Sequence, residues 1–283
     1  MNRSKRNIVW IVSYPKSGNT WFRTVLANLL SDGDNPVDIN ELDLSPIASS
    51  RLHFDEYSGV SSSDLSFEEI EGIQAETYRE LSYETEGLLF RKVHDIWKRN
   101  KDGREIFPAD VTKAVIYIIR NPLDIVISYA FHSNRSFEEI VAQMNDIDMG
   151  LCNKPGKLFN QLKQELGNWS MHVKSWTEDS GLPVHIVKYE DLLNDPEKSF
   201  RKAFQFSGIQ FNPVQLQKAI EFSSFEKLSE NEIRSGFKEK PIKMEKFFRS
   251  GVAGQGKELL SPEVVIQLKE IHQEMMRKFG YVT

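Results

Sequence analysis

The stretch that decides the fold is IVWIVSYPKSGNTWFRTVLANLL, residues Ile8 to Leu30. It opens with five consecutive apolar residues, several of them β-branched, which is typical of a strand buried on both faces of a parallel sheet. After a short turn, apolar side chains recur at helical spacing, at Phe22, Val25, Leu26, Leu29 and Leu30. We therefore predict a helix that packs one face on the sheet and points its N-terminus back at the turn.

The turn between strand and helix suits an anion. Its backbone amides lie at the predicted helix N-terminus, where unpaired N–H groups and the helix dipole favour negative charge. Lys16 adds a movable positive charge, and Gly18 lets the backbone approach a ligand closely. Alternatively, the turn is only a tight connection between strand and helix that binds no ligand. The sequence of the turn alone leaves both interpretations open.

The order of residues in this turn separates it from the Walker A loop, because Lys16 precedes Gly18 and Thr20 stands in place of the final serine or threonine. The segment YPKSGNTW instead resembles the 5'-phosphosulfate loop of the sulfotransferases that use 3'-phosphoadenosine 5'-phosphosulfate (PAPS), usually YPKSGTTW. Only Asn19 departs from that form. The resemblance implies that Lys16 contacts the oxygen bridging sulfur and phosphorus and that Trp21 lies against the adenine. It also implies 5'-phosphate contacts for the loop residues Ser17, Gly18, Asn19 and Thr20.

A second strand-to-helix junction follows. The apolar run from 114 to 119 predicts another buried strand, ended by Arg120, with Asn121 suited to cap a helix and Pro122 to begin it. On that helix Ser128 lies off the predicted core stripe, which is made of Leu123, Val126, Ile127, Ala130 and Phe131. The segment RNPLDIVISYAFH resembles the family's 3'-phosphate motif. The resemblance assigns the 3'-phosphate to Arg120 and Ser128, whereas an arginine at a strand end is otherwise most often structural.

A third strand is predicted at LLFRKVH, residues Leu88 to His94. A single histidine is usually structural, but the family carries Lys-x-His at this point of the chain, and Lys92-Val93-His94 reproduces it. The resemblance implies that His94 is the general base and that Lys92 assists at the transferring group. With Lys16 and Ser128 they form the predicted catalytic set.

A fourth strand, Val184 to Val187, leads into a block in which the resemblance places Tyr189 near the adenine. Farther on, FSSFEKL puts Ser223 and Phe225 where the family has a threonine and a phenylalanine around that base. Phe225 is equally well explained as a core residue.

The last matching segment is FFRSGVAGQGKE, residues Phe247 to Glu258, which resembles the cofactor motif FxRKGxxGDWK. Its Arg-Lys-Gly grips the 3'-phosphate in the family. Arg249 and Gly251 remain here, but Ser250 replaces the lysine and Gln255-Gly256 replaces Asp-Trp. We expect weaker donor binding or compensation by Lys246 or Lys257. The family's short dimer motif is not reproduced after this segment, so the oligomeric state stays open.

Composition supports a single domain, because 283 residues that are 40% hydrophobic can bury one large core and no linker divides them. We predict an α/β fold in which a central parallel sheet is flanked by helices on both faces, a three-layer sandwich like that of P-loop NTPases. Residues 32–86, with 15 acidic residues against two arginines, would form an acceptor-side insertion, and the basic segment 234–257 a loop that covers the cofactor.

The same composition limits the cellular location and the binding partners that we expect for the protein. One cysteine, Cys152, excludes an internal disulfide framework, and the N-terminal apolar run is too short for a signal peptide or a membrane span. We expect a cytoplasmic protein without a membrane partner. A nucleic-acid partner is not expected either, because the net charge is −5 and no basic stripe interleaved with aromatics runs along the chain.

The implied reaction moves a sulfuryl group from PAPS to the hydroxyl of a small alcohol or phenol. It yields a sulfate ester and adenosine 3',5'-bisphosphate (PAP). No metal is expected, because sulfuryl carries less charge than phosphoryl and lysines with helix amides can stabilise it. Two alternatives stay open. A P-loop kinase would use Glu190 or Asp191 with magnesium, and a nucleotide-binding protein would bind without turnover.

Overall fold

The computed structural model describes residues 5–31, 33–241 and 244–282. Within it the chain forms two compact units. Unit 1 holds the chain up to Tyr14 together with Ser45–Tyr117 and Asp146–Ile186, and unit 2 holds Pro15–Leu44, Ile118–Asn145 and the chain from Val187 onward. The prediction of a single domain stays a prediction, since compact units within one chain can fold together or separately.

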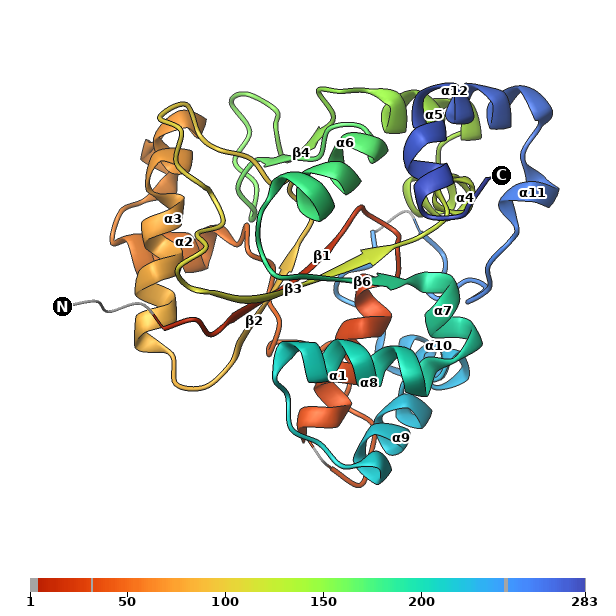
Figure 1. The fold of residues 1–283 in the computed structure, drawn as a ribbon, viewed down its shortest axis with the longest axis horizontal. Coiled ribbons are helices and arrows are strands. Elements are labelled where there is room, and N and C mark those ends of the chain that lie inside the picture. The colour runs from red at the N-terminus through yellow and green to blue at the C-terminus, as the bar shows by residue number, and fades with distance from the viewer. Residues whose placement is uncertain (1–4, 32, 242–243, 283) are drawn as a thin grey trace. The chain divides into compact units, whose positions relative to one another are not determined.

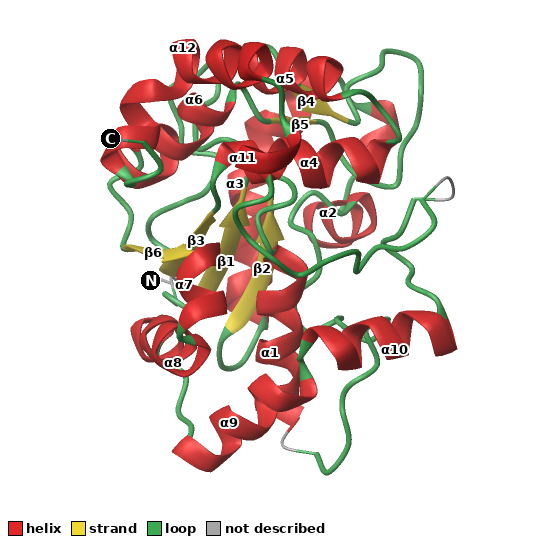
Figure 2. Cartoon of the chain, turned by 90° about the vertical axis from the view of Figure 1, so that its right-hand side faces the viewer, coloured by secondary structure: helices red, strands yellow, loops and turns green. Residues whose placement is uncertain are grey.

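A four-stranded sheet has the order β2-β1-β3-β6 (Figure 2). Its strands are β1 (Ile8–Ser13), β2 (Leu89–Val93), β3 (Thr112–Ile119) and β6 (Val184–Lys188). All of β1 is buried, as its unbroken apolar run predicts, and it pairs in parallel with β2 so that Ile8 lies opposite Leu89. The predicted α/β fold, a parallel sheet flanked by helices, is confirmed.

Unit 1 covers its part of the sheet with helices. They are α2 (Arg51–Ser58), the short 3-10 turn η1 (Ser62–Asp64), α3 (Phe67–Glu84) and α6 (Trp169–Lys174), which continues as the π-helical turn η2 (Ser175–Asp179); β4 (Gly150–Leu151) pairs with β5 (Gln164–Glu165). Helix α3 packs on α2 and starts with a capping box between Ser66 and Glu69. Tyr78 of α3 is buried edge-on against Trp10 at 4.9 Å, and Phe54 of α2 is 3% exposed. These two aromatics of the predicted acceptor-side insertion therefore belong to the core.

Unit 2 is helical. Its helices are α1 (Asn19–Ser31), α4 (Pro122–Ser133), α5 (Phe137–Asn145), α7 (Tyr189–Asn194), α8 (Pro196–Ser207), α9 (Pro213–Phe222), α10 (Phe225–Ser235), α11 (Gly256–Leu259) and α12 (Pro262–Lys278). Helix α9 packs on both α1 and α8, and α4, α5 and α12 contact one another (Figure 1). Asp32, Ile242 and Lys243, which belong to the predicted insertion and covering loop, lie outside the described residues.

The predicted helix starts are found, with the Asn121 side chain capping α4 and Pro122 as its first residue. The prediction of a buried position is wrong for two residues. Leu30 is 40% exposed and Phe131 is 49% exposed, because each lies in the last turn of its helix at the edge of the buried stripe. Cys152 is a free thiol, as predicted. No helix within the described residues is both long and apolar enough to cross a membrane.

Candidate active site

The loop after β1 has an unusual backbone. Lys16 takes a left-handed conformation with φ 70°, which is uncommon for a residue with a side chain and recurs at functional sites. Gly18 has φ 101°, and a Cβ there would lie 2.6 Å from Cδ2 of Tyr189. Glycine is therefore required at this position both by its backbone angle and by the ring packed against it.

Three buried polar atoms around this loop lack a hydrogen-bond partner within the described part of the chain. They are Oγ of Ser17, Nε1 of Trp21 and Nε of Arg120. The three residues are linked in space, because Arg120 donates to the carbonyl of Lys16 at 3.1 Å and both Arg120 and Trp21 contact the ring of Tyr189. Buried polar groups nearly always find partners, so this cluster indicates a polar ligand.

Two arginines add positive charge to the same unit. Arg120 donates to the carbonyls of Lys16 and Val252, each at 3.1 Å, and lies 4.3 Å from the centre of the Tyr189 ring. Burial, and then the charge of Arg120, lower the pKa of Arg249. Among the described residues neither arginine forms an ion pair, and two guanidinium groups near each other favour binding of an anion.

Lys16 points its ammonium group at a histidine that the sequence did not single out. Nζ of Lys16 donates to Nδ1 of His132 at 3.1 Å and lies 4.2 Å from the centre of the Phe247 ring. Both contacts come from unit 2, so the predicted lysine, the arginines and the loop amides share one unit.

The segment predicted to cover the cofactor is anchored by carboxylates. Asp124, 2% exposed in the first turn of α4, accepts from the amides of Gly254 and Gly256, each at 2.7 Å. Glu232 of α10 accepts from the amides of residues 247 and 248. At Gly251, φ is 62° and a Cβ would lie 2.5 Å from Cδ2 of Phe225. Phe225 therefore packs against this segment.

The residues that depart from the family's pattern contact one another. The hydroxyl of Ser250 donates to Oε1 of Gln255 at 3.2 Å, and Arg249 donates to the same oxygen. Lys246 and Lys257, the predicted compensating cations, are exposed.

Two other predicted binding residues differ in accessibility. Ser223 is fully buried, and its hydroxyl accepts from Nδ2 of Asn28 at 3.0 Å and donates to the carbonyl of Ala219 at 2.8 Å. A direct contact of this hydroxyl with a nucleotide requires those bonds to open. Ser128 is partly buried on α4, off the stripe of buried residues, as predicted.

Unit 1 carries the predicted base. Nδ1 of His94 donates to the carbonyl of Ser13 at 2.8 Å. In the neutral ring this bond leaves the lone pair on Nε2, the atom that then accepts a proton. Lys92 lies two residues earlier, in β2, opposite Ile11 of β1.

A second histidine supports the first, and sequence reasoning missed it. His172, fully buried, donates from Nε2 to the carbonyl of His94 at 3.0 Å. Its Nδ1 accepts from the hydroxyl of Tyr117 at 2.8 Å. Burial lowers the pKa of His172 to about 4, so the ring stays neutral and Nδ1 stays an acceptor at neutral pH. Nothing in the local sequence distinguishes this histidine from a core residue.

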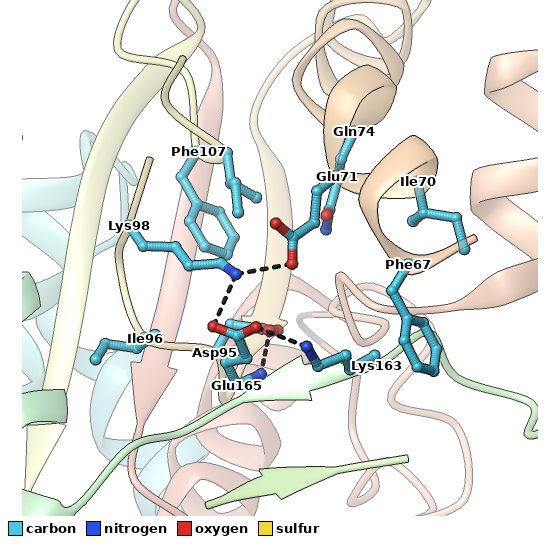
Figure 3. A pocket seen from close by; sticks show the side chains of 11 residues that line it. Phe67, Ile70, Glu71, Gln74, Asp95, Ile96, Lys98, Phe107, Lys163 and Glu165 are labelled. Atoms are coloured by element: carbon cyan, nitrogen blue, oxygen red, sulfur yellow. Dashed lines mark hydrogen bonds and ion pairs between the residues drawn. The ribbon is translucent and has the colours of Figure 1, made fainter. Parts of the chain in front are cut away.

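Beside His94, Asp95 lies in a pocket with two lysines and two glutamates (Figure 3). Lys98 pairs with Glu71 and Glu165, each at 2.7 Å, and Oδ1 of Asp95 accepts from the amide of Glu165 at 3.2 Å. Burial raises the pKa of Asp95 to about 8. Asp95 is therefore largely protonated at neutral pH.

This raised pKa predicts a dependence of stability on pH. The folded state holds the Asp95 proton more tightly than the unfolded state. Protonated Asp95 therefore contributes to the free energy of unfolding at low pH, and this contribution is lost as pH rises toward about 8. Asp95→Asn should remove that loss. Between pH 6 and 8, the melting temperature of the variant minus that of the wild type should therefore increase by up to about 4 °C per pH unit. Differential scanning fluorimetry measures this. Asp102→Asn, an exposed aspartate of the same unit, should follow the wild type, and parallel curves for all three proteins would contradict the assignment.

The fold and the site together define an α/β protein in which a glycine-containing loop joins the first strand to the first helix. The sulfotransferase domain family matches residues 6–280, and the chain belongs to this family. It is 25% identical over 287 residues to the 3-beta-hydroxysteroid sulfotransferase of Cavia porcellus, covering 94% of this chain and 82% of that protein. It is also 25% identical to the luciferin sulfotransferase of Photinus pyralis, covering 96% of this chain and 72% of the relative.

Solved structures show the same fold. A mouse sulfotransferase crystallised with PAP has a TM-score of 0.59 at 21% identity, over 97% of this chain and 86% of that one. A retinol dehydratase crystallised with androsterone and PAP has a TM-score of 0.63 at 19% identity, over 96% and 81% of the two chains. The chain is thus a sulfotransferase-family enzyme.

Proposed function

We propose that the chain transfers a sulfuryl group from PAPS to the hydroxyl of a small alcohol or phenol. The observation that carries the proposal is the cluster in unit 2 of unpartnered buried donors and like charges, at Ser17, Trp21, Arg120 and Arg249. A doubly phosphorylated nucleotide fits this cluster, because it brings several anionic oxygens that need such donors.

The residues would share the nucleotide as follows. The amides of the loop at 17–20 and the N-terminus of α1 would hold the 5'-phosphate, and Arg120, Ser128 and Arg249 the 3'-phosphate. Trp21, Tyr189 and Phe225 would contact the adenine, with Ser223 behind them. The hydroxyl bonds that Ser223 already makes favour an indirect role for it.

When bound, PAPS supplies the sulfuryl group and leaves as PAP. Lys16 would stabilise the negative charge that grows on the phosphate oxygen, and His94 would take the hydroxyl proton at Nε2. Ser13 fixes the tautomer that this role needs, because its carbonyl accepts from Nδ1. Lys92, two residues before His94, would stabilise the transferring group.

A small hydroxylated acceptor agrees with the names of the relatives, which include hydroxysteroid and luciferin sulfotransferases. A cytoplasmic location stays part of the proposal. The kinase alternative loses support for Glu190 as its magnesium ligand, because the Glu190 carboxylate accepts from the amide of Asn121 at 2.9 Å and from the hydroxyl of Tyr281 at 3.2 Å.

The deciding experiment offers the purified protein ³⁵S-labelled PAPS with a panel of steroid alcohols, phenols and aliphatic alcohols. We expect label on at least one acceptor, with the rate unchanged by EDTA. Transfer of ³²P from ATP that EDTA abolishes would instead indicate a kinase. Tight PAP binding with no transfer to any acceptor would indicate a binding protein.

The replacement of the family's lysine predicts a gain of function. Ser250→Lys should raise the affinity for PAP by up to about tenfold, because it adds one charge-assisted hydrogen bond, worth roughly 1.5 kcal/mol. Isothermal titration calorimetry measures the dissociation constant. Ser170→Lys, on α6 of unit 1, adds the same charge elsewhere and should leave the affinity unchanged. Equal affinities for Ser250→Lys and the wild type would show that this position does not face the 3'-phosphate.

A further inference from the structure

A second pocket of unit 1 contains a buried positive charge that has no counter-ion among the described residues. Its cavity volume is about 10 Å³, about the room that one water-sized sphere needs, and residues of α2, α3 and β2 line it. Most of its wall is apolar or aromatic, including Ala48, Phe54 and Leu81. Arg91 of β2 also lines it and is only 6% exposed.

The hydrogen bonds of Arg91 are few. Nη1 donates to the carbonyl of Phe90 at 3.0 Å, and this is its one hydrogen bond within the described residues. The hydroxyl of the neighbouring Tyr78 is already used, since it accepts from Gln74 at 3.0 Å and donates to the carbonyl of Ala48 at 3.3 Å. Burial lowers the pKa of Arg91, but a guanidinium stays charged in proteins. A buried charge in this state is costly unless an ion accompanies it.

A second polar group in the pocket also lacks a partner. Nδ1 of His53 is buried and has no hydrogen-bond partner in the part of the chain that the structure describes. Burial, and then the charge of Arg91, lower the pKa of His53, so the neutral ring carries one N–H to donate. The unpartnered nitrogen and the unpaired guanidinium line the same pocket.

We infer that this pocket binds a single chloride-sized anion, which neutralises Arg91 and stabilises unit 1. A halide suits the wall, because its spherical charge needs few donors and tolerates apolar neighbours on its other sides. A phosphate or sulfate has several oxygens, and each buried oxygen would need its own partner. Besides Arg91 and His53, the polar side chains of the wall are those of Tyr57, Gln74, Thr77 and Tyr78, and the hydroxyls of Thr77 and Tyr78 already donate to the carbonyls of Ile73 and Ala48.

Thermal unfolding of the full chain in sodium chloride and in sodium gluconate, at equal ionic strength, tests the inference. Above the dissociation constant, each tenfold rise in chloride should raise the melting temperature by about 3 °C, whereas gluconate should not. Arg91→Met keeps the side-chain length and should abolish the chloride dependence. Arg79→Met is the matched control, because Arg79 of α3 already pairs with Asp110 and Glu76, and it should keep the dependence. An equal effect of gluconate, or a dependence that survives Arg91→Met, would overturn the inference.

A direct measurement covers the case in which Arg91→Met does not fold. Wild-type crystals soaked in sodium bromide should show an anomalous peak beside the Arg91 guanidinium. Peaks confined to the loop at 16–21, or no peak at all, would overturn the assignment. If sulfate stabilised the protein in a way that depends on Arg91 and chloride did not, the identification of the bound anion as a halide would be overturned. None of these outcomes depends on sulfuryl transfer, so they are independent of the proposed function.

Discussion

His94→Ala is expected to lower the rate of sulfuryl transfer by about 10²- to 10⁴-fold, the usual contribution of a positioned general base. The affinity for PAP should stay within about twofold, because the residues proposed to hold the nucleotide belong to unit 2 and His94 to unit 1. The fold should tolerate the change. The bond from His172 goes to the backbone carbonyl of His94, which alanine retains.

Single-turnover kinetics with ³⁵S-labelled PAPS measure the loss, and a melting curve checks that the variant is folded. His185→Ala, a histidine of β6, is the matched control and should keep the wild-type rate. If His94→Ala sulfated its acceptor at the wild-type rate, another group would have to take the proton.

Lys16→Met is expected to lower turnover by about 10²- to 10³-fold, the usual effect of removing one group that stabilises transition-state charge. PAP affinity should fall far less, because the proposed contact is with an oxygen that gains its charge only as the bond to sulfur breaks. Methionine keeps most of the side-chain length and the contact with Phe247, but it loses the ammonium group that donates to His132.

The experiment compares the change in the rate constant of turnover with the change in the dissociation constant of PAP. Lys218→Met removes a lysine of α9 that pairs with Asp34, and it should change neither value. Equal losses of turnover and of PAP affinity in Lys16→Met would make Lys16 a binding residue only.

The sequence was sufficient where structure depends on neighbours along the chain. The unbroken apolar run at Ile8–Ser13, the glycine turn and the helical spacing after it predicted β1, the loop and α1. The same local rules placed Arg120 at the end of β3 and Asn121 as the cap of α4. Leu30 and Phe131 were misjudged because periodicity does not say where the buried stripe of a helix ends.

What the sequence did not predict depends on pairing across the fold. Asp124 and Glu232 bind backbone amides that lie 130 and 15 residues away, and amides carry no sequence signal. The role of His172 depends on Tyr117 and on a carbonyl 78 residues away. The missing counter-ion of Arg91 likewise becomes visible only when all its neighbours are known.

The carboxylate of Asp124 has a consequence for the timing of the catalytic cycle. One carboxylate accepts from the amides of both Gly254 and Gly256, so full release of this short turn requires both bonds to break. Arg120 donates to the carbonyl of Val252, which lies just before this turn. In the nucleotide site that we propose, PAP would leave Arg120 beside this restrained turn. We therefore expect product release, rather than the chemical step, to limit the rate at saturating acceptor.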